Sequence, residues 1–373
     1  MTNDYNVLVT SMNYNTDGTI TVRGTRQGTK EAFTLICTAE QLCRSTLTPN
    51  NSTNQTSTSV PLFKLSDIPS AMREKGSHMA AYLNEKWLND RSLEMNIAEK
   101  GRWATIRPSL ILYKPDIFNH QWLKKFERYN NALDDIKTNI TSDACKKLIL
   151  KYFKRDGAFR SSKLKKLSYS SESNYKELKN INSRDNSELK KLQKFHENWQ
   201  CQKLLIDDGI NDQLHTFIKS GFKVDDLWAT FGSFAIYAAI GNYRIIPQTG
   251  DYYMVYIESI ICYAIDSYDF IITPDDYLGH WNKKDFDFNI ILKNRINNLN
   301  THRNPRGGDY IGSFNPNNLL YPIYNHHYQE YRKKYQKGKD MVVWTKPEII
   351  SMKDVKNKFK TFVVSKSDIL SSL

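Results

Sequence analysis

The sequence has few cysteines, and their spacing indicates neither a metal site nor a disulfide framework. The 373 residues include five cysteines, an odd number, and no two of them are spaced like paired metal ligands. A chain of this length buries a core large enough to fold without disulfide bonds. We therefore interpret the cysteines as unpaired thiols of a protein made in a reducing cytoplasm.

Long apolar runs are also missing from the sequence. The first residues, MTNDYNVLVT, lack the basic start and the apolar stretch of a signal peptide, and no stretch approaches the length of a membrane span. We therefore expect a protein that is soluble where it is made. Action in another compartment would require a transport route other than general export.

Several common catalytic and binding signatures are absent from the sequence. It contains no internal repeat, P-loop, Rossmann fingerprint, HExxH zinc motif or GxSxG elbow. The 53 Lys and Arg residues exceed the 40 Asp and Glu residues and give a net charge of +13, which favours anionic partners. Much of this excess lies in residues 146–203, where no nucleic-acid-binding module is recognisable. We therefore expect no nucleic-acid partner.

The hydrophobic pattern predicts an α+β protein in three parts. Residues 1–60 contain short strand patterns followed by a polar tract that indicates a linker. Residues 61–220 are predicted to be a mainly helical region with a basic polar loop, and residues 221–373 an antiparallel β-rich catalytic domain. The fold class is thus a helical N-terminal and middle region followed by an antiparallel β domain.

Individual elements follow from the spacing of apolar residues and from capping residues. Helices are predicted over residues 66–87, 119–136, 142–157, 189–199 and 287–299. Strands are predicted at residues 19–22, 32–36, 107–113 and 361–364, and a long loop at residues 161–186.

The clearest strand pattern runs through residues 231–270. Apolar residues alternate up to Ile240, turn-forming residues occupy positions 247–250, and the alternation resumes at Tyr253. We therefore predict a β-hairpin whose second strand ends in the sequence Asp-Ser-Tyr-Asp-Phe, residues 266–270.

This strand end carries two carboxylates and a phenol within four residues. On a regular strand Asp266 and Tyr268 share a face and Asp269 points the other way, so the three converge only if the backbone bends after Tyr268. Two close carboxylates can hold a divalent cation, or divide the roles of general base and general acid. Alternatively, the Asp side chains cap the following turn, and the spacing alone favours that structural role over catalysis.

Residues 232–270 resemble the catalytic region of the colicin M family of bacteriocins, in which a similar hairpin leads into an Asp-x-Tyr-Asp-Phe motif. Here the motif residues are Asp266, Tyr268, Asp269 and Phe270. The resemblance implies a half-barrel catalytic domain that hydrolyses lipid II between the undecaprenyl carrier and the pyrophosphate and so blocks peptidoglycan synthesis. It also implies Mg²⁺ as the cofactor, with Asp266 and Asp269 as its ligands.

The sequence departs from this family just after the motif. The family has a His-Arg pair where this chain has Asp275 and Asp276. An enzyme of this type needs cations or proton donors to offset phosphate charge. The resemblance therefore implies that His280, Arg303 or Arg306 takes this catalytic role, and His280 is our first choice.

From about residue 65 onward the chain also resembles an uncharacterised family of bacterial proteins found with type VI secretion spike genes. The residues that carry this resemblance are 68–72, the helix around Trp122, 231–234, 266–270, 278–281 and 306–310. The resemblance implies an antibacterial effector that is made in the bacterial cytoplasm, secreted without a signal peptide, and active in the target-cell periplasm. The implied partners are lipid II or another polyprenyl pyrophosphate as substrate, a cognate immunity protein, and a secretion spike or adaptor protein.

Two other function classes stay open. A non-enzymatic adaptor or chaperone of the secretion spike would use the motif as a structural turn and would tolerate a carboxamide at Asp266. A nuclease that exploits the charge of +13 would be toxic in the cytoplasm rather than in the periplasm. The sequence contains no recognisable nuclease signature.

Overall fold

The structure is a computed structural model, and the α and β elements that it contains confirm the α+β class. It divides into two units, one of residues 1–76 and 272–328 and the other of residues 77–271 and 329–373. The residues that it describes are 7–14, 19–26, 32–38, 63–155, 167–170, 175, 178, 181–207, 224–271, 277–284, 286–287, 320–353 and 359–371.

Within its described residues, the first unit contains two small antiparallel sheets. The first sheet has the order β1-β2-β3 and the second has the order β12-β11-β13. The bounds are β1 Val7–Tyr14, β2 Thr19–Arg26, β3 Ala32–Thr38, β11 Tyr277–Trp281, β12 Phe286–Asp287 and β13 Tyr321–Tyr324. The two predicted N-terminal strands are therefore confirmed as β2 and β3, and β1 was not predicted.

The second unit is built on a six-stranded sheet in which β10 is an inner strand. The order is β4-β14-β10-β7-β6, and β15 pairs with another part of β10. The pairing of β4 with β14 is parallel, and the other pairings are antiparallel. The bounds are β4 Ile111–Tyr113, β6 Gln200–Ile206, β7 Phe234–Ile240, β10 Ser259–Tyr268, β14 Met341–Trp344 and β15 Glu348–Ser351. Strands from residues 61–220 thus share one sheet with strands from residues 221–373.

The predicted hairpin is confirmed, and it passes from one sheet into another. Its base pairs β7 with β10, and its tip pairs β8 (Asn242–Pro247) with β9 (Tyr252–Ile257). The tip belongs to a four-stranded sheet of order β16-β9-β8-β5, where β5 is Leu167–Ser170 and β16 is Lys360–Ser365.

The change of sheet occurs at Gly241, which lies between β7 and β8. A Cβ atom at this position would lie 2.4 Å from the Ser259 Oγ and 2.7 Å from the Ser259 carbonyl oxygen. The Gly241 N–H donates to that same carbonyl at 2.9 Å. Because any side chain would collide with the opposite strand, glycine is required where the hairpin bends.

Most predicted helices are present, but two of them are interrupted. The helix predicted over residues 66–87 breaks around Gly76, whose φ of +82° is left-handed. The helix predicted from Asn119 begins as expected, since the Asn119 side chain accepts a 3.0 Å hydrogen bond from the Trp122 N–H, but it breaks between α4 and α5. The α-helices are α2 Ile68–Glu74, α3 His78–Asn89, α4 His120–Leu123, α5 Glu127–Asn139, α6 Asp143–Arg155, α8 Asn186–Trp199, α10 Asp226–Phe231, α12 Asn325–Tyr335 and α13 Lys366–Ser371. Two 3-10 helices are η1 Leu65–Asp67 and η2 Pro108–Leu110.

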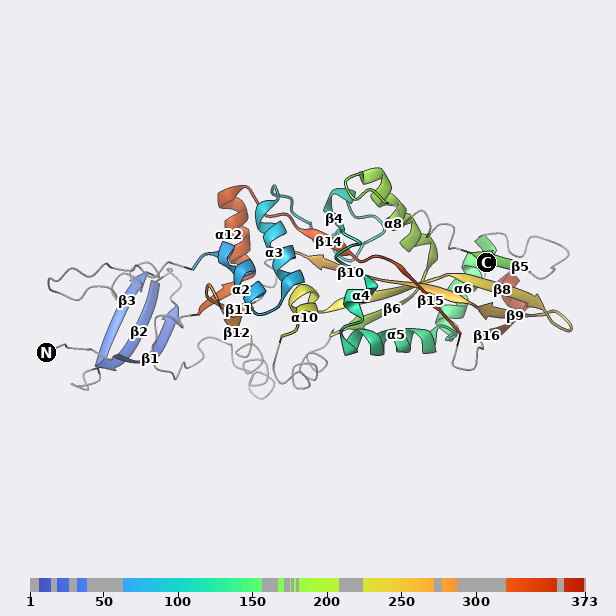
Figure 1. The fold of residues 1–373 in the computed structure, drawn as a ribbon, viewed down its shortest axis with the longest axis horizontal. Helices are drawn as coiled ribbons and strands as arrows, with labels where there is room; N and C mark the ends of the chain where they lie inside the picture. Colours follow the sequence, from blue (N-terminus) through green and yellow to red (C-terminus); the bar gives the residue numbers. More distant parts are fainter. Residues whose placement is uncertain are drawn as a thin grey trace. The chain divides into compact units, whose positions relative to one another are not determined.

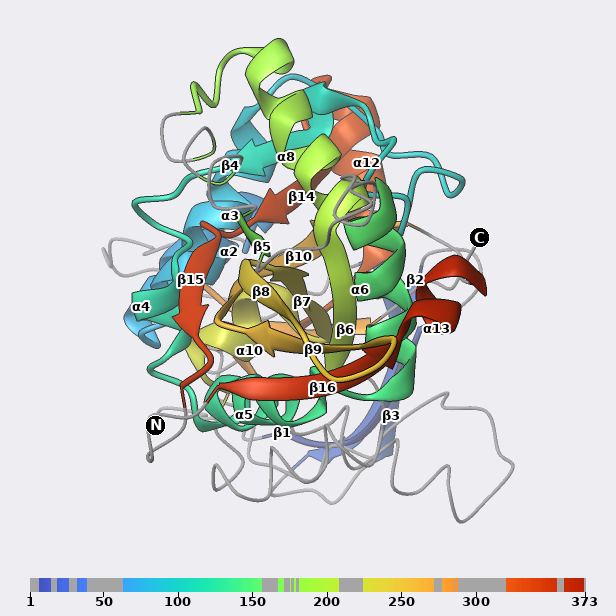
Figure 2. The ribbon, with the colours of Figure 1, turned by 90° about the vertical axis from the view of Figure 1, so that its right-hand side faces the viewer.

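Helices cover both faces of the six-stranded sheet. In Figures 1 and 2, α8 lies on one side of β6, β7 and β10, and α5 lies on the opposite side. Both helices contact β6. The strand β7 is buried along its whole length, as expected for an inner strand between two layers of helices.

The predicted loop at residues 161–186 and the predicted helix at residues 287–299 remain to be compared with the structure. The loop predicted at residues 161–186 contains β5, which pairs with β8, so this prediction is wrong there. The helix predicted at residues 287–299 lies outside the described residues, apart from Asp287 at the end of β12. No helix among the described residues has the length and apolar composition that a membrane crossing requires.

Candidate active site

The acidic motif lies where β10 leaves the six-stranded sheet. Asp266 pairs with Val343 and Tyr268 with Met341 on β14, so both belong to the regular ladder. The strand ends at Tyr268, and Asp269 lies outside it. Regular pairing therefore stops at the position where the sequence predicts a bend.

Asp266 is a part-buried carboxyl group in an environment that disfavours its ionised form. Burial raises its pKa well above 3.8, and the charge of Asp269 raises it further. A hydrogen bond with the backbone of Ser267 and the charge of Lys100 lower the pKa, but they do not offset the effect of burial. Asp266 is therefore a carboxyl group that tends to stay protonated.

Asp269 differs from Asp266 because it has a cationic partner. Its side chain is 2% exposed, and its Oδ1 lies 3.1 Å from the Lys100 Nζ. Its Oδ2 is also buried and has no hydrogen-bond partner in the described part of the chain. Lys100 is 48% exposed, so the only cation found against Asp269 among the described residues reaches solvent. A buried carboxylate oxygen without a donor is expensive in a folded protein and indicates a place for a cation, a proton or a water.

Tyr268 is held by α3 rather than by the two carboxylates. The Asn84 Nδ2 donates a 2.9 Å hydrogen bond to the Tyr268 hydroxyl oxygen. Burial raises the Tyr268 pKa far above its ordinary value of 10.0, so the phenol stays neutral. The neighbouring Phe270 packs edge-on against Tyr268 and against Trp87, with ring centroids 5.3 and 5.0 Å apart. These contacts fix the end of the motif against α3.

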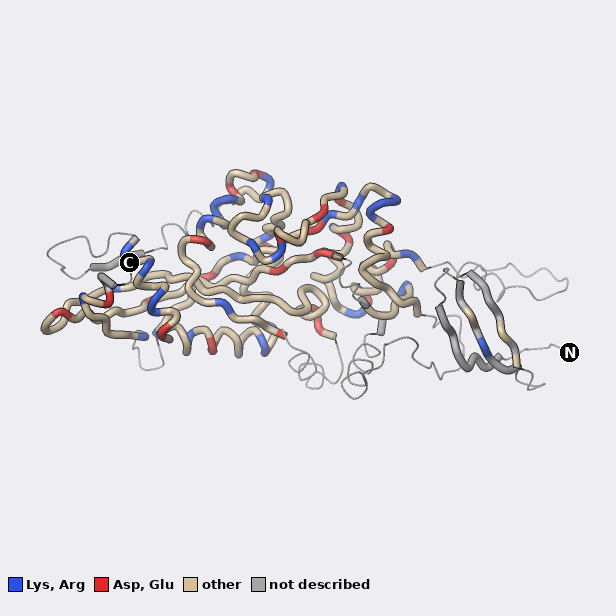
Figure 3. The backbone as a smooth tube through the Cα atoms, turned by 180° about the vertical axis from the view of Figure 1, so that it is seen from behind, with Lys and Arg blue, Asp and Glu red and all other residues tan. Residues whose placement is uncertain are grey.

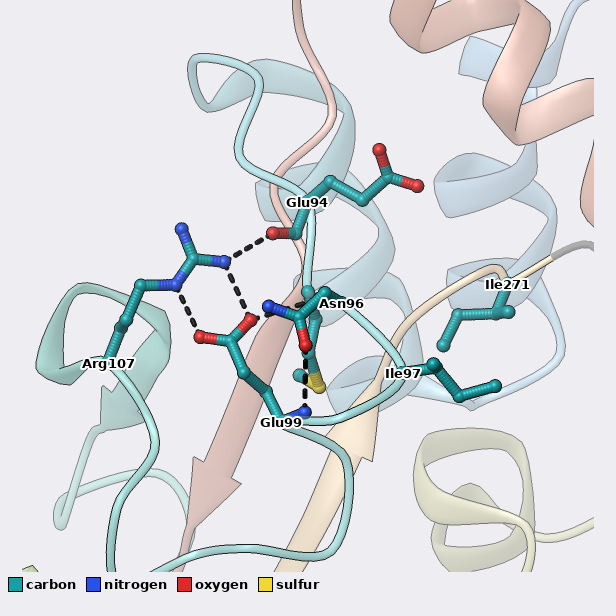
Figure 4. Close-up of a pocket in the computed structure, with 7 residues that line it drawn as sticks. Glu94, Asn96, Ile97, Glu99, Arg107 and Ile271 are labelled. Atoms are coloured by element: carbon teal, nitrogen blue, oxygen red, sulfur yellow. Dashed lines mark hydrogen bonds and ion pairs between the residues drawn. The ribbon is translucent and has the colours of Figure 1, made fainter.

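A surface hollow of about 540 Å³ adjoins the motif, since one of its walls is Ile271, the second residue after Asp269. The rest of the hollow is lined by the loop that follows α3, which carries Lys100, and by Arg107 at the end of this loop. In Figure 4, Arg107 reaches Glu99 and the carbonyl oxygen of Glu94, and Ile97 and Ile271 lie on the side away from Arg107. Ile97 is 70% exposed, so the hollow combines an ion pair with an exposed apolar wall.

The other predicted site residues are not all described. His280 lies on β11 in the first unit, where it pairs with Asp287 on β12 and with Pro322 on β13. Arg303 and Arg306 lie outside the described residues. The structure therefore brings Asp266 and Asp269 together in the second unit, with Tyr268 between them in the chain, and gives no test of the other three.

Sequence reasoning missed Lys100 and Asn84. Lys100 lies in a polar loop without hydrophobic periodicity, and Asn84 lies on a helix whose pattern indicates only which face is buried. Each meets the motif across more than 160 positions of the chain. No local pattern could have identified these partners.

The resemblance implies Mg²⁺ as the cofactor. The described residues offer few ligands for this ion. Among the described residues, no group of three or more His, Cys, Asp or Glu side chains could hold a metal ion. Mg²⁺, however, often binds through one or two carboxylates together with waters and substrate phosphates. The Asp269 Oδ2, which has no partner among the described residues, fits that mode and would hold the ion, and Asp266 would join it as a ligand only after losing its proton.

Comparison with known proteins gives one family. The model of DUF6402, a family of unknown function, matches residues 63–360, which is most of the chain. No curated protein matches the chain. No solved structure matches it either.

Proposed function

The chain belongs to the DUF6402 family, and from this premise we propose that it is an antibacterial toxin and a type VI secretion effector that hydrolyses lipid II between undecaprenyl and pyrophosphate. The finer description of its fold, a half-barrel like that of the colicin M family, is part of this proposal. It is supported by the long hairpin that changes sheets at Gly241 and ends in the acidic motif.

The observation that carries the proposal is the unequal pair of carboxyl groups at the end of β10. Asp266 favours its protonated form because of burial and the charge of Asp269. Asp269 has Lys100 as an ionic partner and keeps one oxygen without a donor in the part of the chain that the structure describes. Two carboxyl groups whose environments differ in this way can act as acid and base in one reaction. A turn that only needed capping would have no use for a buried, unsatisfied oxygen.

The proposed reaction transfers the pyrophosphoryl group of the lipid to water. The water oxygen forms a bond to the phosphorus next to the prenyl oxygen, and the bond between that phosphorus and the prenyl oxygen breaks. Asp269 accepts the proton of the water, and Asp266 donates its proton to the departing prenyl oxygen. The products are undecaprenol and a pyrophosphorylated muropeptide. The two carboxyl groups then exchange protons with solvent to regain their starting states.

Phosphate charge must be offset during this reaction. Lys100 is suited to do so, because its side chain is half exposed and can turn from Asp269 toward a phosphate oxygen. Mg²⁺, when bound, would neutralise part of the pyrophosphate charge. His280, Arg303 and Arg306 stay candidates from the resemblance to the colicin M family.

The proposal includes the route and the partners of the toxin. The protein would be delivered by a secretion spike or an adaptor into the periplasm of a rival, where lipid II is available, and the producing cell would need an immunity protein. Figure 3 shows acidic and basic residues interspersed along the described chain. This distribution gives no support to a nuclease, which would favour a continuous basic surface.

The proposal is tested by directing the chain to each compartment of a bacterial cell that lacks immunity. We expect periplasmic expression to cause growth arrest and lysis, and cytoplasmic expression to be tolerated. Asp266→Asn should abolish the periplasmic effect. The matched control is Asp226→Asn, which changes another part-buried Asp with a raised pKa, one that accepts hydrogen bonds at the start of α3 and is remote in sequence from the motif. The control should stay toxic if it folds.

Other outcomes would favour the other function classes. Toxicity in the cytoplasm would indicate a nuclease or another intracellular toxin. No toxicity in either compartment, with folded protein present in both, would contradict the proposal and favour an adaptor or chaperone of the spike.

A further inference from the structure

A buried ion pair is connected by hydrogen bonds to the candidate active site. Arg332 on α12 and Asp340 before β14 are 5% and 0% exposed, and the Arg332 Nη2 donates to the Asp340 Oδ1. The Trp87 Nε1 donates to that same oxygen at 2.9 Å, and the guanidinium carbon of Arg332 lies 5.1 Å from the centre of the Trp87 ring. A charged pair this deeply buried is costly to desolvate, and removal of one partner would leave the other charge buried without compensation.

This pair holds one wall of the hollow. The Asp340 Oδ2 accepts a 2.9 Å hydrogen bond from the Met95 N–H, and the Arg332 Nη1 lies 3.3 Å from the Glu94 Oε1. Glu94 and Met95 both line the hollow. The loop that carries Lys100 is therefore fastened to the buried pair at its beginning.

The same pair is linked through Gln329 to the end of the acidic motif, next to Ile271 of the hollow. The Gln329 Oε1 accepts a 3.2 Å hydrogen bond from the Arg332 Nη1, and the Gln329 Nε2 donates a 2.6 Å hydrogen bond to the Phe270 carbonyl oxygen. Phe270 links Asp269 to Ile271, which lines the hollow. Gln329 is 6% exposed, so water does not compete strongly for this contact.

Close packing around Trp87 and Gly338 restricts the movement of the Arg332 side chain. Gly338 has a φ of +106°, and a Cβ atom there would lie 2.6 Å from the Trp87 ring. The Gly338 carbonyl oxygen accepts a 3.0 Å hydrogen bond from the Arg332 Nε. The guanidinium group is thus held by contacts on several sides and cannot turn without losing them.

We propose that Gln329, with the Arg332–Asp340 pair behind it, is a positioning residue that holds the acidic motif at a fixed distance from the loop carrying Lys100. The Gln329 amide donates to the Phe270 carbonyl of the motif and accepts from the Arg332 guanidinium. The Phe270 peptide is therefore held in place by a side chain that is itself held by the buried pair. The expected effect of Gln329 on kcat rests on the proposed hydrolase function. The expected effect on the hydrogen exchange of residues 268–271 does not rest on it.

The test is Gln329→Glu, which keeps the shape of the side chain and its acceptor for Arg332 but cannot donate to the Phe270 carbonyl. We expect kcat on lipid II to fall by about 10- to 100-fold, because small displacements of reacting groups cost this much, while KM changes little. We also expect hydrogen exchange of the amides at residues 268–271 to accelerate by about tenfold, as for the loss of one hydrogen bond.

The matched control is Tyr175→Phe, which removes a different buried donor to a main-chain carbonyl. The Tyr175 hydroxyl donates to the Pro347 carbonyl oxygen at 2.9 Å. This variant should lose a similar amount of thermal stability, yet keep the wild-type kcat and the wild-type exchange at residues 268–271.

The kcat and hydrogen-exchange results together decide whether Gln329 positions the motif. Unchanged kcat and unchanged local exchange in Gln329→Glu would overturn it, and so would equal effects in Tyr175→Phe. An inactive wild-type protein would refute the hydrolase proposal, and the exchange experiment would still decide whether Gln329 positions the motif. If Gln329→Glu does not fold, Gln329→Met, which removes the donor without adding a charge, is measured in its place.

Discussion

Asp266→Asn should stabilise the protein more and more as the pH rises. In the folded protein the pKa of Asp266 is raised well above 3.8, first by burial and then by the charge of Asp269. In the unfolded chain this carboxyl group has its ordinary pKa. Between these two pKa values the folded state holds a proton that the unfolded state has released. The free energy of unfolding of the wild type must then fall as the pH rises. Asparagine does not titrate, so the variant lacks this loss.

The size of the effect follows from the number of protons. One proton difference changes the free energy of unfolding by about 1.4 kcal/mol per pH unit. For a folded unit of roughly 150–250 residues, this corresponds to about 3–6 °C in melting temperature per pH unit. The variant's advantage in melting temperature should therefore be small near pH 4 and should grow by this amount over each unit of pH above pH 5, up to the folded-state pKa.

The assay is thermal unfolding of both proteins across this pH range in EDTA, so that no divalent cation competes with the proton. Asp269→Asn serves as a comparison at the motif, because it removes the smaller of the two causes that raise the Asp266 pKa and should lower the pH at which the dependence ends. A melting-temperature difference that does not change with pH would show that Asp266 is ionised in the folded protein. That result would refute the assignment of Asp266 as the proton donor.

Three further predictions concern the scaffold. Gly241→Ala should cost about 1–3 kcal/mol in chemical denaturation, because the added Cβ would lie 2.4 Å from the Ser259 Oγ; an unchanged unfolding midpoint would show that the hairpin bends elsewhere. Asp340→Ala should cost about 3–5 kcal/mol, because it leaves the Arg332 guanidinium buried without its partner; a loss below 1 kcal/mol would mean that water reaches this group. Asn119→Ala should cost about 1 kcal/mol through loss of the cap of α4, and Asn119→Asp, which keeps the acceptor, should restore most of it.

The sequence was informative wherever structure follows from a local pattern. Strict alternation predicted the hairpin of residues 231–270, and an Asn before an apolar helical pattern predicted the cap at Asn119. The two carboxylates at the strand end could be named as candidates because they end a predicted strand and because residues 232–270 resemble the colicin M catalytic region, although spacing alone favours a structural role. These predictions needed only neighbours in the chain.

The remaining features depend on contacts between distant positions. Met95 and Asp340 are 245 positions apart, and Asn84 and Tyr268 are 184 apart, so no spacing rule relates them. The break at Gly76 was missed because apolar residues keep their helical spacing across it. The mixture of early and late strands in one sheet likewise reflects tertiary packing, which a linear division at residues 60 and 220 could not represent.

In the proposed function, Asp266 takes part in the cleavage of lipid II. The most direct test of this role is incubation of the purified protein with lipid II and Mg²⁺, beside Asp266→Asn protein shown to be folded by its melting curve. We expect release of undecaprenol and a pyrophosphorylated muropeptide by the wild type and none by the variant. Equal release by the variant, or no release by folded wild-type protein across a range of divalent metals, would contradict this role.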